Sequence, residues 1–235
     1  MKSRIWAAFQ LDALFQFRSG FYAIYLILSL IYIIIVNTLP TKWGAIAVPF
    51  MIFSDPSVLG FFFIGGLVML EKGQGILDLV SVTPLSEVEY LLSKIISLNV
   101  IALLASLAIV TFTHQSFNLI LLILSVLLSS SFFTMFGFLV ALSSHSINQY
   151  FGKVIPLMLL IIIPVFSLIG FPFSKLFYVF PSTASAKLMI DTFFGCHLLD
   201  TVMCLLILMA WNCLIFIHVI KKFKAYVITG GADNG

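Results

Sequence analysis

The chain has 235 residues, of which 62% are hydrophobic and only 9% charged, and its formal net charge is +3. Soluble globular domains carry about a quarter charged residues, so a chain this apolar needs a lipid bilayer to cover its surface. The composition excludes a soluble enzyme, and the small net charge gives no reason to expect nucleic acid as a partner. We expect a single all-α integral membrane domain over residues 1–235.

The N-terminal segment, residues 1–18, is predicted to be an amphipathic helix. Asp12, Gln16 and Arg18 interrupt it and no small-residue cleavage site follows, which argues against a signal peptide. Its apolar residues fall at helical spacing on one stripe: Ile5, Trp6, Phe9, Ala13 and Phe17. Because Asp12 and most other polar residues fall off this stripe, we expect the helix to lie in the cytoplasmic interface of the membrane. A frayed terminus is the alternative.

Six apolar runs approach the roughly 20 residues that a helix needs to cross a bilayer. They cover residues 21–39, 45–70, 95–112, 119–142, 154–171 and 198–220. Six transmembrane helices place both termini on one side. Of the 12 Lys and Arg residues, nine lie on that side and three (Lys42, Lys175 and Lys187) on the other. The positive-inside rule then predicts a multi-pass protein of the plasma (cell) membrane with both termini cytoplasmic.

A polar segment, residues 71–94, separates the second run from the third on the predicted cytoplasmic side. Two glycines, Gly73 and Gly75, each disfavour helix by roughly 1 kcal/mol, so we expect a bend there. The short apolar pattern of residues 76–82 predicts a small amphipathic helix that has no core of its own to cover.

Two helix starts compete in the second half of this segment. Thr83 before Pro84 fits an N-cap followed by a proline at the first helical position. Ser86 with Glu89 three residues later fits a capping box. Either start predicts a short cytoplasmic helix that precedes the third span at an angle.

The segment before the last span, residues 171–197, is too apolar for a simple external loop. We expect two short external re-entrant helices, broken at Pro181, that dip into the outer leaflet. Irregular backbone at that depth has to be buried in protein or line a cavity.

Asp55 is the only acidic residue deep within an apolar run, where a charge is costly. It is predicted to cap a restarted half-helix within residues 54–56, or to line a pathway and attract a cationic substrate; the two roles are compatible, and the cap is favoured. Further candidate pathway residues are an aromatic run and one amide: Phe61, Phe62, Phe63 and Asn212. For Asn212, an interhelical hydrogen bond is the simpler expectation. Close approach between helices is expected at Gly60, Gly65 and Gly66.

Catalytic motifs are absent from the sequence. It contains no G-x-x-x-x-G-K-[ST] for nucleotide phosphates and no H-E-x-x-H for zinc, and its three cysteines fit no metal motif. We therefore expect no catalytic site, no metal site and no cofactor bound by this chain.

Residues 71–85 carry the pattern E-K-x-x-G-x-L-x-x-x-x-V-T-P-L, and FSDPSVLGFFFIGG precedes it at residues 53–66. This combination resembles the coupling-helix region of ABC type-2 transporter permeases, and is most similar to the permeases of fluoroquinolone-export ABC transporters. The resemblance covers most of the chain and is weak after Lys224.

The resemblance implies a transmembrane subunit that binds two copies of a cytoplasmic ABC ATPase, which hold the ATP and Mg, and pairs with a second permease, either a copy of itself or a paralogue. Residues 1–18 would be the connecting helix, and residues 76–82 the coupling helix. Leu77 and Val80 would anchor it, while Glu71 and Lys72 would orient its hinge. The implied ATPase-coupling residues are Glu71, Lys72, Ile76, Leu77, Asp78, Leu79, Val80, Thr83 and Pro84.

The expected function is outward transport of an amphiphilic, drug-like substrate, driven by ATP hydrolysis in the partner subunit. A permease for peptide, lipid-linked sugar or sodium is an alternative of the same class. An ion-coupled secondary transporter and a non-transporting membrane scaffold are alternatives of other classes. A secondary transporter would normally need several ionisable groups within its spans, and this sequence offers one.

Overall fold

The computed structural model describes residues 2–55, 59–77, 83, 85–113, 116–169, 177–195 and 197–228. These residues are almost entirely helical and none of them forms a strand, which confirms the all-α fold class. The helices in chain order are α1 (Lys2–Arg18), α2 (Phe21–Thr38), α3 (Thr41–Ser54), α4 (Gly60–Gly73), α6 (Glu87–Phe112), α7 (Leu119–Leu142), α8 (Ile147–Ile162), η2 (Ile163–Ile169), α10 (Pro181–Phe194) and α11 (Leu198–Ile228).

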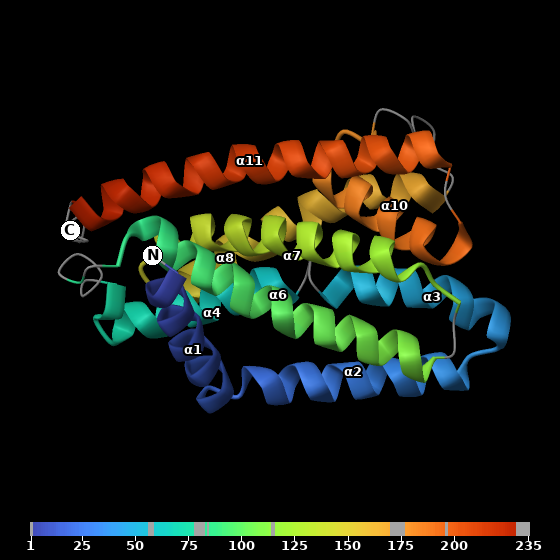
Figure 1. Ribbon diagram of the computed structural model, residues 1–235, viewed down its shortest axis with the longest axis horizontal. Helices are drawn as coiled ribbons and strands as arrows, with labels where there is room; N and C mark the ends of the chain where they lie inside the picture. The colour runs from blue at the N-terminus through green and yellow to red at the C-terminus, as the bar shows by residue number, and fades with distance from the viewer. Residues whose placement is uncertain are drawn as a thin grey trace.

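Five of the described helices are long and apolar enough to cross a membrane: α2, α6, α7, α8 continued by η2, and α11. The predicted second span is instead divided into α3 and α4, each of 14 residues. These two helices follow one another along the long axis of the bundle (Figure 1). The count of six crossings stays a prediction, since it depends on α3 and α4 acting together as a broken span.

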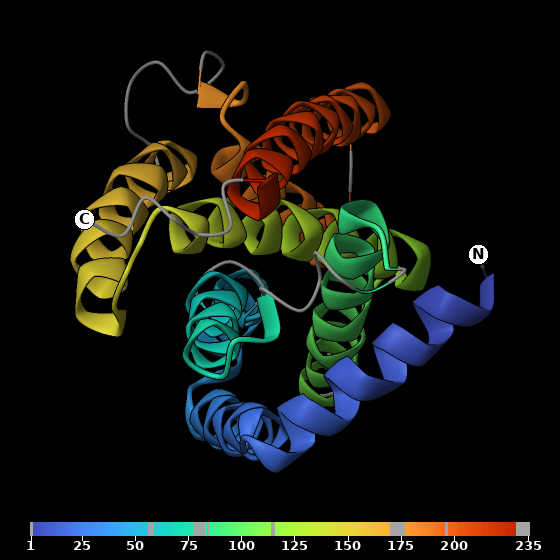
Figure 2. The ribbon, with the colours of Figure 1, turned by 90° about the vertical axis from the view of Figure 1, so that its left-hand side faces the viewer.

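Helix α7 forms the centre of the bundle. It packs against α4, α6, α10 and α11, and Figure 2 shows it in the middle with α4 and α11 on opposite sides. Its crossing with α4 depends on Gly137, where an added Cβ would lie 2.7 Å from the carbonyl oxygen of Phe61. A side chain there would separate the two helices.

The two ends of the bundle differ in what they hold. Both termini lie at one end, together with the end of α4 and the start of α6, while the α2–α3 turn and α10 lie at the other (Figure 1). This arrangement agrees with the expected topology, in which the termini and the polar segment share one side of the membrane. Which side that is stays a prediction.

The helix that carries the third span differs from its prediction. Of the two predicted starts, the helix uses the capping box. The Ser86 hydroxyl accepts from the Glu89 N–H, and the Glu89 carboxylate accepts from the Ser86 N–H. From there α6 runs unbroken for 26 residues. The separate short helix predicted before the span is therefore wrong, because no Gly or Pro follows Glu87 to end the helix before Phe112.

The external segment is confirmed in part. Helix α10 begins with Pro181 at its first position, as predicted. It is mostly buried and packs against α3, α7 and α11, so it forms part of the bundle at the end away from the termini. The first of the two predicted helices falls largely on residues 170–176, which are outside the described part of the chain.

Candidate functional site

A buried ionic cluster, consisting of Asp12, Glu71 and Lys94, joins α1, α4 and α6 at the end of the bundle that holds the termini. Lys94 Nζ lies 2.7 Å from Asp12 Oδ1 and 2.6 Å from Glu71 Oε1. The Lys94 side chain is 0% exposed. A buried ammonium needs partners of opposite charge, and two carboxylates supply them here.

Hydroxyl groups complete the ionic cluster. Ser93 Oγ donates to Asp12 Oδ2 at 2.5 Å, and the Tyr90 hydroxyl donates to Glu71 Oε2. One turn further along, Gln16 Nε2 donates to Ser97 Oγ at 2.7 Å. Each carboxylate therefore has both an ion pair and a hydrogen bond, which offsets the cost of removing it from water.

These contacts settle the orientation of α1. The helix is present as predicted, but Asp12 and Gln16 face α6, whereas Trp6 and Phe17 are 59% and 69% exposed. Asp12 and Gln16 are thus the residues that attach α1 to the bundle. The exposed apolar face fits a helix that lies against lipid, which stays a prediction.

Lys72 attaches the same end of α4 to α7. Its Nζ donates to the carbonyl oxygens of Ala141, Leu142 and Ser144 at 3.0, 3.2 and 2.9 Å. The last carbonyls of a helix have no partners within it and carry partial negative charge, so a cation is favoured there. Partial burial, together with the positive charges of Lys153 and Lys222, lowers the pKa of Lys72 to about 8.

The last turns of α11 reach the same region. The ring of Phe223 packs 5.2 Å from that of Tyr90 and 5.3 Å from that of Phe138. Lys72 Nζ lies 4.8 Å from the ring centroid of Tyr226. Through two adjacent residues, Glu71 and Lys72, the end of α4 is therefore in contact with α6, α7 and α11, and Lys94 connects it further to α1.

The predicted coupling helix begins where α4 ends. Gly75 has a φ of +68°, which glycine adopts readily, and the chain turns there as predicted. Ile76 and Leu77 are helical. Four of the implied coupling residues lie outside the described residues: Asp78, Leu79, Val80 and Pro84.

Leu77 differs from its expected place. It is 1% exposed and belongs to the hydrophobic core, so its side chain holds the segment to this chain and is not a surface anchor for a partner. Ile76 is half-buried and Thr83 is exposed. The sequence could not distinguish Leu77 from Ile76, because both fit the same short apolar pattern.

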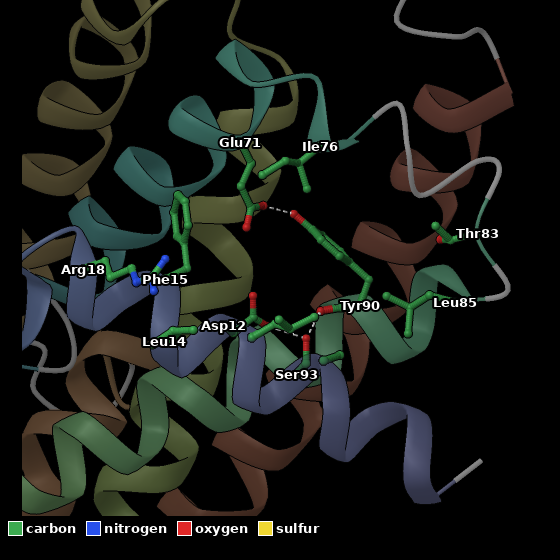
Figure 3. Close-up of a pocket in the computed structure, with 12 residues that line it drawn as sticks. Asp12, Leu14, Phe15, Arg18, Glu71, Ile76, Thr83, Leu85, Tyr90 and Ser93 are labelled. Carbon is green, nitrogen blue, oxygen red and sulfur yellow. Dashed lines mark hydrogen bonds between the residues drawn. The ribbon is translucent and has the colours of Figure 1, made fainter.

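A cavity of about 430 Å³ lies between α1 and the polar segment. Its lining includes Leu11 and Phe15 of α1, Ile76 and Leu85 of the polar segment, and Tyr90 of α6. Figure 3 shows the carboxylates of Asp12 and Glu71 reaching toward this space from different helices. The ionic cluster therefore borders an apolar hollow beside the predicted coupling helix.

The three candidate aromatic residues pack against different helices. Phe61 stacks on Phe136 of α7, Phe62 stacks on Phe151 of α8, and Phe63 packs edge-on against α2. The rings of Phe61 and Phe62 also lie 6.4 Å apart, and the role of these residues in a pathway stays a prediction. Asn212 forms the expected interhelical bond, since its Nδ2 donates to the Leu128 carbonyl of α7 at 3.1 Å.

Asp55 follows α3 directly and is 0% exposed. Among the described residues, neither of its carboxyl oxygens has a hydrogen-bond partner. The Leu59 N-cap of α4 has no side-chain cap bond. The cap predicted at Asp55 involves residues 56–58, which lie outside the described part of the chain, so it stays a prediction.

The ionic cluster was not predicted, although the sequence contains a signal for it. Tyr90, Ser93, Lys94 and Ser97 are spaced to lie on one face of a helix, and Asp12 and Gln16 are spaced likewise. A polar stripe of this kind on an apolar helix indicates that the helix faces another polar stripe. The spacing does not show which two helices meet.

Comparison with known proteins places this arrangement in a family context. Residues 3–230 match the fluoroquinolones export permease protein family. Curated relatives are the fluoroquinolones export permease proteins of two Mycobacterium tuberculosis strains, CDC 1551 / Oshkosh and H37Rv. Each is 28% identical over 182 residues, which is 77% of this chain and 77% of the relative.

Proposed function

This chain belongs to the fluoroquinolones export permease protein family, and from that premise we propose that it is the transmembrane subunit of an ATP-binding-cassette exporter in the plasma membrane. ATP and Mg are held by two copies of a cytoplasmic ATPase subunit, and a second permease, identical or paralogous, completes the pathway. The cargo is an amphiphilic, drug-like molecule that moves outward.

The observation that carries the proposal is the position of Glu71 and Lys72. Both lie immediately before the segment proposed to contact the ATPase. Glu71 bonds to Tyr90 and Lys94 of α6, and through Lys94 to α1. Lys72 bonds to the end of α7. A displacement of residues 76–82 is therefore passed to three helices at once.

This geometry supports a mechanical role for the polar segment. When ATP binding brings two ATPase subunits together, short helices seated on them move with them, and rigid attached helices rotate. Leu77, buried in the core, acts as the pivot of the segment, while Ile76 and the exposed Thr83 flank the surface offered to the partner.

The test is to express the chain with a candidate ABC ATPase subunit from the same genome and to measure co-purification, drug-stimulated ATP hydrolysis and efflux of a fluorescent fluoroquinolone. Deleting residues 76–82 should abolish co-purification and efflux. If the complex survives that deletion, these residues are not the docking segment, and the proposal fails at its central point.

A second variant separates docking from coupling. Glu71→Gln leaves Lys94 paired with Asp12, so the ATPase should still bind. Stimulated hydrolysis should fall about 2- to 30-fold, the range that a coupling loss of 0.5–2 kcal/mol implies. Glu87→Gln is the matched control, because Glu87 lies on the first turn of α6 and forms none of the ion pairs found among the described residues. Equal effects of the two substitutions would contradict the coupling role of Glu71.

A further inference from the structure

Asp55 occupies the break between α3 and α4, inside the bundle. Its carboxyl group is 0% exposed, and both oxygens lack a hydrogen-bond partner among the described residues. A buried carboxylate with neither ion pair nor hydrogen bond is strongly disfavoured, so the group has to be neutralised. A carboxyl retained in such a place marks a functional site by default.

Helix α2 passes the break on one side. The Tyr32 hydroxyl lies 3.1 Å from Ser54 Oγ, just before the break, and the ring of Tyr25 packs 5.0 Å from that of Phe63, beyond it. Between these contacts lies Ser29. Over the described residues, the Tyr25 hydroxyl and Ser29 Oγ are also buried without hydrogen-bond partners, and Tyr25 is within electrostatic range of Asp55.

Helix α7 passes the break on the other side. The ring of Phe53 packs 6.3 Å from that of Phe133 before the break, and a Cβ on Gly60 would lie 3.7 Å from Thr134 Oγ1 beyond it. Thr134 Oγ1 is likewise buried and without a partner. Hydroxyls from two helices, without partners in the described part of the chain, thus lie on either side of the break that begins at Asp55.

No fixed cation balances this carboxyl within the described part of the chain. The titratable groups of α2 nearby are Tyr25 and Tyr32, and α7 has none. Helix α10 contributes Lys187, which pairs with Asp191 of the same helix, and that carboxylate also accepts from Thr201. Asp55 can therefore be neutralised by its own proton or by a cation that enters the site.

We propose that Asp55 is a cation-exchange site: its carboxyl holds a proton at rest and releases it when an organic cation binds. The O–H bond breaks, the proton leaves to water, and the carboxylate pairs with the positive group of the incoming molecule. Hydroxyl groups can turn to suit either the protonated or the ionised carboxyl, and these are supplied by Tyr25, Ser29 and Thr134. The inference rests on the proposed transport function and narrows its cargo to cationic amphiphiles.

Dicyclohexylcarbodiimide tests the resting state, because this apolar reagent adds to protonated carboxyls. The full chain in lipid nanodiscs is treated with it, and the mass gain is located by mass spectrometry. Asp55 should be labelled, whereas Asp12 and Glu71, which pair with Lys94, should not. Asp55→Asn should lose the label and Asp55→Glu should keep it. An unlabelled Asp55 would overturn the proposal.

Tetraphenylphosphonium tests the exchange, with neutral triphenylphosphine oxide as its matched control. The cation should slow labelling of Asp55 at least about tenfold, which corresponds to 1.4 kcal/mol, and should release protons into weakly buffered medium. The neutral compound and Asp55→Asn should do neither. Labelling that the cation leaves unchanged would refute cation binding. None of these measurements uses the ATPase, so they can fail or succeed independently of the ABC exporter assignment.

Discussion

At the scale of single residues, the adjacent pair Glu71 and Lys72 shows how one turn of helix can serve several neighbours. Successive helical side chains project about 100° apart. Glu71 therefore reaches α6 and Lys72 reaches α7 from the same turn. Lys94 extends the connection, because it holds Glu71 and Asp12 together in a fully buried ionic cluster.

The ionic cluster makes a prediction about stability. Lys94→Met leaves two carboxylates buried without a cation, and breaking a buried ion pair from one side costs about 3–5 kcal/mol. We expect a large fall in the midpoint of thermal unfolding, followed by circular dichroism in mild detergent. The variant Asp12→Asn/Glu71→Gln/Lys94→Met removes all the charges together and should recover most of that loss. A triple variant no more stable than Lys94→Met would show that packing, not charge, explains the effect.

At the scale of the helices, close approach depends on particular glycines. A Cβ on Gly65 would lie 1.8 Å from Tyr150 Cζ, whereas on Gly66 its nearest contact would be Phe21 Cζ at 3.8 Å. Tyr150 is fully buried, and its hydroxyl donates to the Phe61 carbonyl. Its ring therefore cannot move aside without giving up that bond, and the α4–α8 contact requires glycine at position 65.

Gly65→Ala and Gly66→Ala form a matched pair that tests this contact. Overpacking a filled core costs about 1–3 kcal/mol, so Gly65→Ala should lower the unfolding midpoint clearly. Gly66→Ala makes only ordinary van der Waals contact and should change it little. The measurement is the same thermal unfolding in mild detergent. Equal effects of the two alanines would contradict the packing of Tyr150 on Gly65.

At the scale of the whole molecule, the two ends of the bundle carry different chemistry. The end with both termini holds Glu71, Lys72 and Lys94, the start of α6 and the end of α11. The other end holds the α2–α3 turn and α10, whose Lys187 is paired within its own helix. A transporter worked by a cytoplasmic ATPase needs the first of these ends to face the cytoplasm.

Cysteine labelling in intact cells tests that orientation. In a variant without the native cysteines, Lys42→Cys at the start of α3 should react with a membrane-impermeant maleimide added outside. Lys224→Cys near the end of α11 should react only after the cells are opened. Both lysines are exposed in the structure, so burial does not bias the comparison. The opposite pattern would invert the topology.

The sequence alone determined that this is an all-α membrane protein, because amino-acid composition and the length of the apolar runs decide whether a chain needs lipid. It also located the start of α10 at Pro181, the bend at Gly75, and both possible starts of α6, since glycine, proline and capping residues act over a single turn. These signals are local, and the structure follows them where nothing distant competes.

Only the tertiary structure decided which helices meet. The sequence placed Asp12 only off the apolar stripe of α1, and the resemblance implied a partner surface for Leu77. An amphipathic pattern does not say whether its polar side faces water or another polar stripe. Phe61, Phe62 and Phe63 likewise pack against three different helices, which their common run in the sequence does not reveal. Partners for buried charges and rings come from segments far apart in the chain, and their proximity is set by packing of the whole bundle.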